Sequence, residues 1–215
     1  MSDLIWVYAE VIADKVARAT LKLLSKAAEV GAAEAILLGP APDDAISTLA
    51  AHGARKVYRA ANPVFREYLT LPAVETIAAL IQKYQPAVLL FAQSYAGRDP
   101  AAALSAKLDC GAITDVVDFA VKDGAVEATI PALGGSYQNT STLVHRGTKL
   151  LLVRPKSFDI KPNPQPATVE EVRDPSESAL RKVRVLERVT TKQEGPQLED
   201  SRVIVSGGRG LKGPE

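Results

Sequence analysis

The glycine-rich run Ser206-Gly207-Gly208-Arg209-Gly210 carries the clearest chemical signal in this sequence. It follows the apolar residues Val203–Val205, which predict a buried strand leading into the loop. Glycines let a backbone approach a ligand closely, and the planar, permanently charged Arg209 suits a phosphate or a reduced flavin ring. The run therefore predicts a nucleotide- or flavin-binding loop. A tight turn with a solvated Arg209 is an equally good interpretation of the pattern alone.

The glycines also match the spacing of a dinucleotide fingerprint, as Gly208-x-Gly210-x-x-Gly213. That fingerprint needs a helix after the loop and an acidic residue ~20 positions further on, and these 215 residues contain neither. We therefore expect a second domain to begin near Gln197, of which this sequence holds only the start.

The segment 93–100, Gln-Ser-Tyr-Ala-Gly-Arg-Asp-Pro, is a second candidate site because it follows the most hydrophobic predicted strand. Its polar groups lead to a helix N-terminus, where an anion or a nucleotide can bind. Asp99-Pro100 also has the form of an N-cap followed by a proline at the first helical position. Capping is the default role of such residues, so we favour a structural role, with Arg98 bracing the fold or facing a partner.

The remaining reactive side chains argue against hydrolytic or metal chemistry. His52 and His145 stand alone, and neither belongs to a metal-ligand or Ser/His/Asp pattern. Cys110 follows a predicted helix end, so we expect a core residue, and a single cysteine fits a reducing compartment. We predict no catalytic and no metal-binding residue. A net charge of +1 and an aromatic content of 5% also disfavour a nucleic-acid partner.

Four strand–helix units must position the second candidate site. The predicted strands are short apolar runs at 4–9, 35–38, 56–59 and 87–91. Their helices are predicted from Asp14 to Gly31, from Asp43 or Asp44 to Gly53, from Pro72 to Tyr84 and from Asp99 to Leu108. This alternation predicts an α/β fold, a parallel sheet with helices on both faces and ligand-binding loops at the carboxyl ends of its strands.

After Cys110 the pattern changes to strands without intervening helices, which predicts mixed or antiparallel pairing. These strands are expected at 113–121, 126–130, 140–144 and 149–153, with Asp123-Gly124 as a tight hairpin turn. Proline and mixed charge dominate 154–202, where 168–172 and 180–189 suit exposed edge strands. The predicted organisation is a domain at 1–153, a linker arm at 154–196, and at 197–215 the start of a second, Rossmann-like domain with its first strand.

Four motifs occur in the order of one known family. They are Ser94-x-x-Gly97-Arg98-Asp99, Ile113-Thr114-Asp115-Val116, the segment 134–142 with Asn139-Thr140, and 203–211 with the glycine-rich run. Through these residues the sequence resembles the alpha subunit of electron transfer flavoproteins over nearly its whole length, and the last motif is the most specific. The resemblance implies that 197–215 begins an FAD-binding domain, with Ser206, Gly207, Gly208, Arg209 and Gly210 as its cofactor-binding residues.

The resemblance further implies an electron carrier without substrate turnover of its own. It implies a heterodimer with a beta subunit that holds an AMP, while the N-terminal domain of the alpha subunit is empty and serves partner association. Electrons would come from acyl-CoA and other dehydrogenases, as in fatty acid beta-oxidation, and pass to an electron transfer flavoprotein-quinone oxidoreductase in the membrane. We expect residues 1–215 alone to fold through about Pro196 and to retain no FAD.

The N-terminal residues show no signal or transit peptide, and no apolar run is long enough to span a bilayer. We therefore expect a location in the bacterial cytoplasm, or in the mitochondrial matrix for a mature eukaryotic form.

A different interpretation is a stand-alone α/β regulatory module that binds ATP or AMP at the loop after the fourth strand. Such a module would bind nucleotide alone and stay colourless, whereas a flavoprotein subunit would pair with a beta chain and turn yellow. A glycine-rich dehydrogenase domain is a third alternative, supported only by the formal fingerprint.

Overall fold

The computed structural model describes residues 4–122, 125–175, 182–189, 201, 203–211 and 213. They fall into two compact units, Met1–Val185 and Leu186–Glu215, and each is described by itself.

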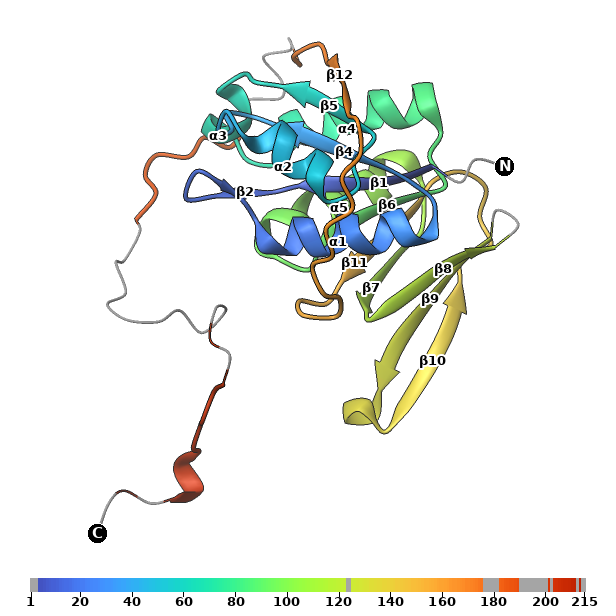
Figure 1. The fold of residues 1–215 in the computed structure, drawn as a ribbon, viewed down its shortest axis with the longest axis vertical. Coiled ribbons are helices and arrows are strands. Elements are labelled where there is room, and N and C mark those ends of the chain that lie inside the picture. Colours follow the sequence, from blue (N-terminus) through green and yellow to red (C-terminus); the bar gives the residue numbers. More distant parts are fainter. Residues whose placement is uncertain are drawn as a thin grey trace. The chain divides into compact units, whose positions relative to one another are not determined.

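A seven-stranded parallel sheet forms the centre of the first unit (Figure 1). Its strand order is β12-β5-β4-β1-β6-β11-β7, so β1 lies in the middle with neighbours on both sides. In the register of these central strands, Val7 pairs with Ala35 on one side and with Leu90 on the other. The strands are β1 Leu4–Ala9, β4 Ala32–Leu38, β5 Lys56–Ala60, β6 Val88–Ala92, β7 Ala112–Val116, β11 Lys149–Val153 and β12 Thr168–Glu171. The predicted parallel sheet is confirmed. It extends to β11 and β7, which were expected to pair in a mixed or antiparallel way, and the strand predicted at 113–121 is divided into β7 and β8.

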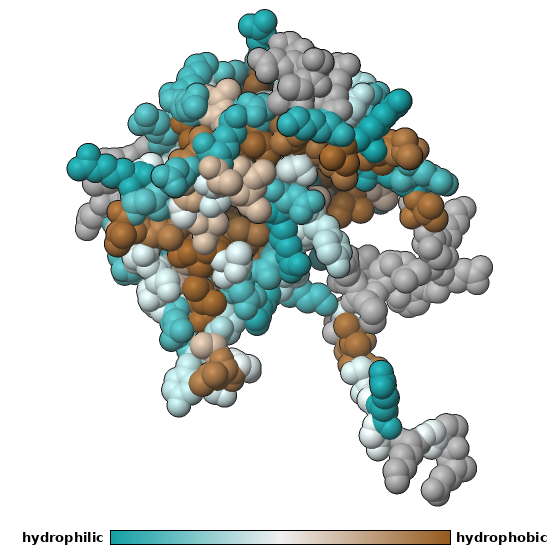
Figure 2. Space-filling model, turned by 180° about the vertical axis from the view of Figure 1, so that it is seen from behind, coloured by the Kyte–Doolittle hydropathy of each residue, from teal (hydrophilic) through white to brown (hydrophobic). Residues whose placement is uncertain are grey.

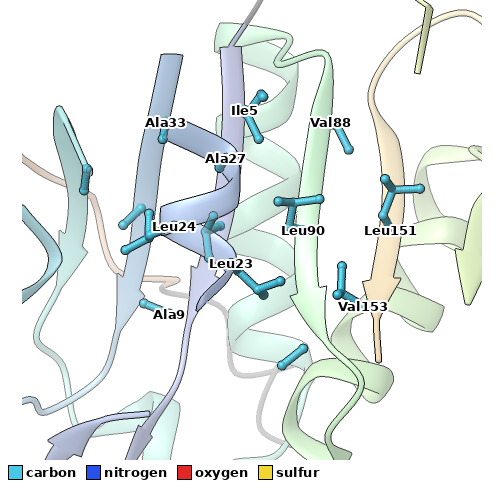
Figure 3. Close-up of a cluster of buried hydrophobic side chains, with 14 of the residues drawn as sticks. Ile5, Ala9, Leu23, Leu24, Ala27, Ala33, Val88, Leu90, Leu151 and Val153 are labelled. Carbon is cyan, nitrogen blue, oxygen red and sulfur yellow. The ribbon is translucent and has the colours of Figure 1, made fainter. Parts of the chain in front are cut away.

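Helices cover both faces of this sheet, as predicted. On one face, α1 Arg18–Val30 and α2 Ala45–Ala51 pack on the strands, and Figure 3 shows Leu23, Leu24 and Ala27 of α1 against them. The other face is covered by α3 Val64–Glu67, α4 Leu71–Tyr84 and α5 Tyr95–Leu108. A fully buried leucine such as Leu24 contributes about 1.5–3 kcal/mol of transfer free energy, so these layers account for much of the stability.

Two helices begin at other residues than predicted. Residues 11–16 form a small hairpin, β2 Val11–Ile12 and β3 Lys15–Val16, so α1 begins at Arg18 and not at Asp14. Asp14 lies at the hairpin tip with a φ of 55°, in the left-handed region that aspartate tolerates. Helix α5 begins at Tyr95 and not after Asp99, because the Ser94 hydroxyl accepts a hydrogen bond from the Gly97 N–H at 2.9 Å. Pro100 consequently lies inside the helix.

The expected antiparallel strands form a separate three-stranded sheet. It consists of β8 Asp118–Lys122, β9 Ala125–Ala132 and β10 Tyr137–Thr142, with the 3-10 turn Leu133–Gly135 between the last two. The predicted turn residues Asp123 and Gly124 lie outside the described residues. The β9–β10 hairpin projects from the parallel sheet (Figure 1), and Figure 2 shows hydrophobic atoms at the tip of this projection. Leu133 and Tyr137 of the hairpin are exposed.

The arm after β11 is held to the first unit by strand pairing and backbone hydrogen bonds. Its strand β12 pairs with β5, which confirms an edge strand at 168–172. Val172 donates a backbone hydrogen bond to Arg59 at 2.7 Å, and the Leu69 N–H donates to the Val183 carbonyl at 3.0 Å. These bonds place the described part of the arm, through Val185, in the same compact unit as the sheet.

Glu170 fixes β12 by side-chain contacts as well. Its carboxylate accepts hydrogen bonds from the Tyr84 hydroxyl at 2.6 Å and lies 2.6 Å from the Lys56 ammonium. The bonds from Lys56, Tyr84 and Lys83 hold the pKa of Glu170 at about 2. The arm is therefore anchored by ionised as well as backbone groups.

The second unit contains the glycine-rich run. Residues 203–208 form no strand, and Val203 and Val205 are exposed, so the buried strand predicted there is wrong for the described residues. A strand needs a neighbour for its N–H and C=O groups, and no other described residue of this unit belongs to a strand. The run ends in a short 3-10 turn, Arg209–Leu211.

Candidate functional site

The five predicted cofactor-binding residues are exposed. They form an open loop, Ser206–Gly210, which leads into the turn closed by a hydrogen bond from the Leu211 N–H to the Gly208 carbonyl at 3.0 Å. A Cβ added to Gly208 or Gly210 would meet no atom within 4 Å, whereas one on Gly207 would lie 2.4 Å from the flexible Leu211 side chain. The loop backbone is thus accessible to a ligand.

The donors of this loop fit the flavin that the resemblance implies. A hydroxyl, backbone N–H groups beside glycines and the Arg209 guanidinium are the groups that bind phosphate oxygens or a negatively charged flavin ring. The described residues of the second unit do not surround the loop with apolar walls. The chemistry of the donor set fits FAD, and the enclosure of a flavin needs further protein surface.

The second candidate segment lies at the point where the order of the sheet reverses. From β1 the chain continues to β4 and β5 on one side, and β6 and β11 lie on the other. The helix after β1 covers one face and the helix after β6 covers the opposite face. In open α/β sheets, ligands bind in the crevice outside the carboxyl ends of two such strands. Here that position is flanked by Glu10 after β1 and by Gln93 and Ser94 after β6.

Glu10 is the functional candidate that the sequence did not reveal. It is only 6% exposed, its Oε1 accepts a hydrogen bond from the Ser94 hydroxyl at 2.6 Å, and its N–H donates to Thr20 Oγ1 at 3.0 Å. Burial raises the pKa of Glu10, and the bond from Ser94 opposes that rise. Burial and the nearby Glu10 charge together raise the pKa of Tyr8 to about 12. The only sequence signal was a carboxylate directly after a buried strand.

Gly97 explains why the residues at this position are closely packed. A Cβ at this position would lie 2.2 Å from the Ala92 carbonyl oxygen and 3.2 Å from Glu10 Oε1. The first turn of α5 therefore sits directly against the end of β6 and the buried carboxylate. Ser94 and Gly97 have the structural, capping role that we favoured, although the cap is Ser94 and not Asp99.

Arg98 does not brace the buried structure. It is exposed, and its guanidinium lies 5.9 Å from the ring centre of Tyr95, which is 88% exposed. The role in bracing the fold is therefore not seen, and a role of Arg98 in facing a partner stays a prediction.

A third motif forms a polar bridge between strand ends. Asp115, with a left-handed φ of 63°, accepts two hydrogen bonds from the Arg154 guanidinium, both at 2.7 Å. Its N–H donates to Gln93 Oε1 at 2.8 Å. Arg154, which the sequence did not single out, follows β11, so this bridge joins residues at the ends of β6, β7 and β11. These contacts connect the loop after β6 with the ends of β7 and β11.

The other singled-out residues make local contacts. His52 Nδ1 lies 2.7 Å from the Thr48 carbonyl oxygen, and His145 Nε2 lies 3.2 Å from that of Thr148. Cys110 is half-buried and free, and burial raises the pKa of its thiol. Asn139 and Thr140 lie on the exposed strand β10. Within the described ranges, no three or more His, Cys, Asp or Glu side chains gather as a metal site would require.

The comparisons with known proteins agree with the motifs. The family described as "Electron transfer flavoprotein domain" matches residues 5–179. The chain is 30% identical over 220 residues to "Protein FixB" of Clostridium saccharobutylicum, covering 98% of this chain and 65% of that protein. It is 27% identical to "Electron transfer flavoprotein subunit alpha" of Thermoanaerobacterium thermosaccharolyticum, covering 98% and 66%. With the protein of that name from Megasphaera elsdenii the identity is 30%, covering 98% and 65%.

The chain thus spans about two thirds of the length of the curated relatives it matches. The family match covers most of the first unit, including the motifs at 94–99 and 113–116. The alignments with the relatives extend over the glycine-rich run. The resemblance drawn from the motifs is confirmed, and this chain belongs to the electron transfer flavoprotein family.

Proposed function

We propose that this chain is part of the alpha subunit of a heterodimeric, FAD-containing electron transfer flavoprotein and serves as an electron carrier without substrate turnover of its own. The observation that carries the proposal is the family match over residues 5–179, together with relatives named alpha subunits that align with 98% of the chain. The alternative of a stand-alone nucleotide-binding module receives no comparable support.

In this proposal Ser206, Gly207, Gly208, Arg209 and Gly210 contact the FAD. The bound FAD supplies the capacity to take up and release electrons. The open loop supports this role, because its backbone donors and the Arg209 cation are accessible. The guanidinium carries a permanent charge, so it would favour the reduced, anionic flavin over the neutral one. Since apolar walls are lacking around the loop in the described residues, we expect residues 1–215 alone to retain no FAD.

The partners follow from the same family. We propose a beta subunit that carries an AMP as the obligate partner, and acyl-CoA and other dehydrogenases as electron donors. The acceptor would be the electron transfer flavoprotein-quinone oxidoreductase, which passes electrons to the quinone pool. None of the described helices is long and apolar enough to cross a bilayer. We propose that the protein meets this acceptor at the membrane from the cytoplasm of a bacterium, or from the mitochondrial matrix in a eukaryote.

Co-purification with a beta subunit and a flavin measurement test this function. The complete alpha subunit containing this sequence, together with its beta subunit, should be yellow, and its FAD should bleach when a dehydrogenase and its substrate are added. Arg209→Ala should weaken FAD binding about tenfold or more, because a hydrogen bond to a charged group contributes roughly 1.5–3 kcal/mol. The matched control is Arg173→Ala, an exposed arginine of the first unit. A colourless complex, or equal FAD affinity in both variants, would contradict the assignment.

A further inference from the structure

The arm makes a second contact with the first unit, beyond β12, and this contact is much smaller. Residues 183–185 run antiparallel to the chain just before α4 and form an isolated bridge with it. The Leu69 N–H donates to the Val183 carbonyl at 3.0 Å, and the Val185 N–H donates to the Glu67 carbonyl at 2.8 Å. Leu69 and Val183 remain 46% and 53% exposed, so the contact buries little apolar surface.

Thr70, next to this contact, has a backbone conformation that a threonine rarely adopts. Its φ is 56° and its ψ is −61°, the angles of a strained γ-turn, which a bond from the Leu71 N–H to the Leu69 carbonyl closes at 2.6 Å. Glycine adopts a positive φ readily, whereas the branched side chain of threonine makes it costly. Thr70 is also the N-cap residue of α4, yet its side chain makes no capping hydrogen bond. An N-cap threonine normally has an extended backbone and accepts a bond from a helix N–H.

The arm contact and the strained turn are connected through one residue. The Leu69 N–H donates to the arm, and the Leu69 carbonyl accepts the bond that closes the turn at Thr70. When the arm leaves, Leu69 is free to rotate, and Thr70 can relax to an extended backbone and cap α4 with its hydroxyl. Relief of strain and a new cap thus offset the loss of two backbone bonds. A segment with two arrangements of similar free energy is a two-state element.

We propose that residues 183–185 are a releasable latch between the arm and the first unit, and that Thr70 sets how often the latch opens. Strand β12 stays in place when it does, because it pairs with β5 along its whole length and its Glu170 belongs to an ionised network. Opening therefore moves the last fixed point of the arm from Val185 back to the region of β12. The latch lies wholly in the first unit and does not depend on the proposed flavin contact.

Amide hydrogen exchange of this chain, followed by NMR, measures the opening of the latch. The N–H groups of Leu69 and Val185 report on the latch itself. The N–H group of Val172, which donates to the Arg59 carbonyl at 2.7 Å, reports on the attachment of the arm at β12. Protection factors compare them, because they reflect the free energy of the local opening that exposes each amide.

Two variants separate the strain from the cap. Thr70→Gly removes the strain of the latched state, and Thr70→Val keeps the branched shape but removes the hydroxyl that caps α4 in the released state. The control is Gln85→Gly, which relieves a positive φ of 47° at the other end of the same helix. Circular dichroism checks that each variant folds.

In the unchanged chain, Leu69 and Val185 should be at least about tenfold less protected than Val172. Thr70→Gly should raise the protection of Leu69 and Val185 about tenfold, which corresponds to about 1.4 kcal/mol. Thr70→Val should raise it about threefold or more, and Gln85→Gly should leave it unchanged. If Thr70→Gly does not fold, Thr70→Val decides.

Three results would overturn the proposal. Equal protection of Val185 and Val172 in the unchanged chain would mean that residues 183–185 open only together with β12. A folded Thr70→Gly variant in which Val185 is no better protected would remove Thr70 from the latch. The same gain in Gln85→Gly as in Thr70→Gly would show a general stabilisation of α4 and not a specific effect on the arm.

Discussion

Two loops with similar residue chemistry, Gln93–Gly97 and Ser206–Gly210, are used differently in this protein. Both combine a serine, small residues and a nearby arginine, and either could have been a phosphate-binding loop. In the first, Ser94 bonds to both Glu10 and Gly97, and Gln93 bonds to Asp115. In the second, the residues are exposed, and a Cβ added to two of the three glycines would meet no atom within 4 Å. Composition alone therefore does not identify a ligand site. What matters is whether the polar groups are already bonded within the protein or are accessible to a ligand.

The largest expected effect comes from adding one methyl group to each loop. Gly97→Ala places a Cβ 2.2 Å from the Ala92 carbonyl oxygen, which cannot move without disturbing β6, so we expect a loss of about 3 kcal/mol in the free energy of unfolding. Gly210→Ala meets no atom within 4 Å and should change it by less than about 0.5 kcal/mol. Urea denaturation of both variants measures the difference, and equal stabilities would contradict the contrast between the loops.

Removing the hydroxyl of Ser94 should have the next largest effect. Ser94→Ala deletes the cap of α5 and leaves the buried Glu10 carboxylate without this donor, which we expect to cost about 2 kcal/mol. Because this bond lowers the pKa of Glu10, the pKa should rise further in the variant. The control is Ser47→Ala, which loses one exposed bond to the Asp44 carbonyl and should cost about 0.5 kcal/mol. Thermal and urea unfolding compare them, and a smaller loss for Ser94→Ala than for its control would refute the bracing role.

A pH series extends the comparison to the arm. The folded pKa of Glu170, at about 2, lies below its ordinary value of 4.5, so its contribution is present above pH 4.5 and is lost as the pH falls toward 2. The side chain is 28% exposed, so after screening by solvent we expect about 1–2 kcal/mol. Glu170→Gln should remove this acid-dependent part of the stability curve, whereas Glu171→Gln, next to it on β12, should keep it. Identical curves for the two variants would show that the network around Glu170 does not stabilise the fold.

The smallest effect is expected at Arg209. Arg209→Ala removes an exposed side chain, so the unfolding free energy of the first unit should change by less than about 0.5 kcal/mol, even if flavin binding in the complete protein is lost. Urea denaturation of this chain checks it. A loss of 1 kcal/mol or more would mean that the arginine contributes to the fold, and the contrast between the two loops would weaken.

The sequence predicted the parts of the fold that depend on local patterns. The apolar runs 4–9 and 149–153 are strands with the predicted bounds, since an apolar run between turn residues is a local property. The two helix starts were wrong because an aspartate at 14 or 99 has the form of a cap, whereas Asp14 lies in the hairpin 11–16 and the cap of α5 is Ser94. The assumption that Val203–Val205 forms a strand failed because a strand also needs a neighbour.

The candidate sites were only half predictable for a related reason. Ser94 and Asp115 were visible as motif residues, but their partners Glu10 and Arg154 are distant in the sequence and belong to no recognisable spacing. A single sequence contains no information on which of several buried or strand-end charges will meet. The roles of the glycine-rich residues remain proposals that depend on the flavin experiment.

The place of β12 in the sheet has a consequence for synthesis of the protein on the ribosome. Thr168 pairs with Lys56, so β5 stays an open sheet edge until the segment 168–171 has been made. At roughly 5–20 residues per second, this interval is on the order of ten seconds. During that time the N–H and C=O groups of β5 could pair with another nascent chain. After that time the edge strand is β12, whose Glu170 and Glu171 disfavour pairing with another chain, as charged residues on an edge strand do.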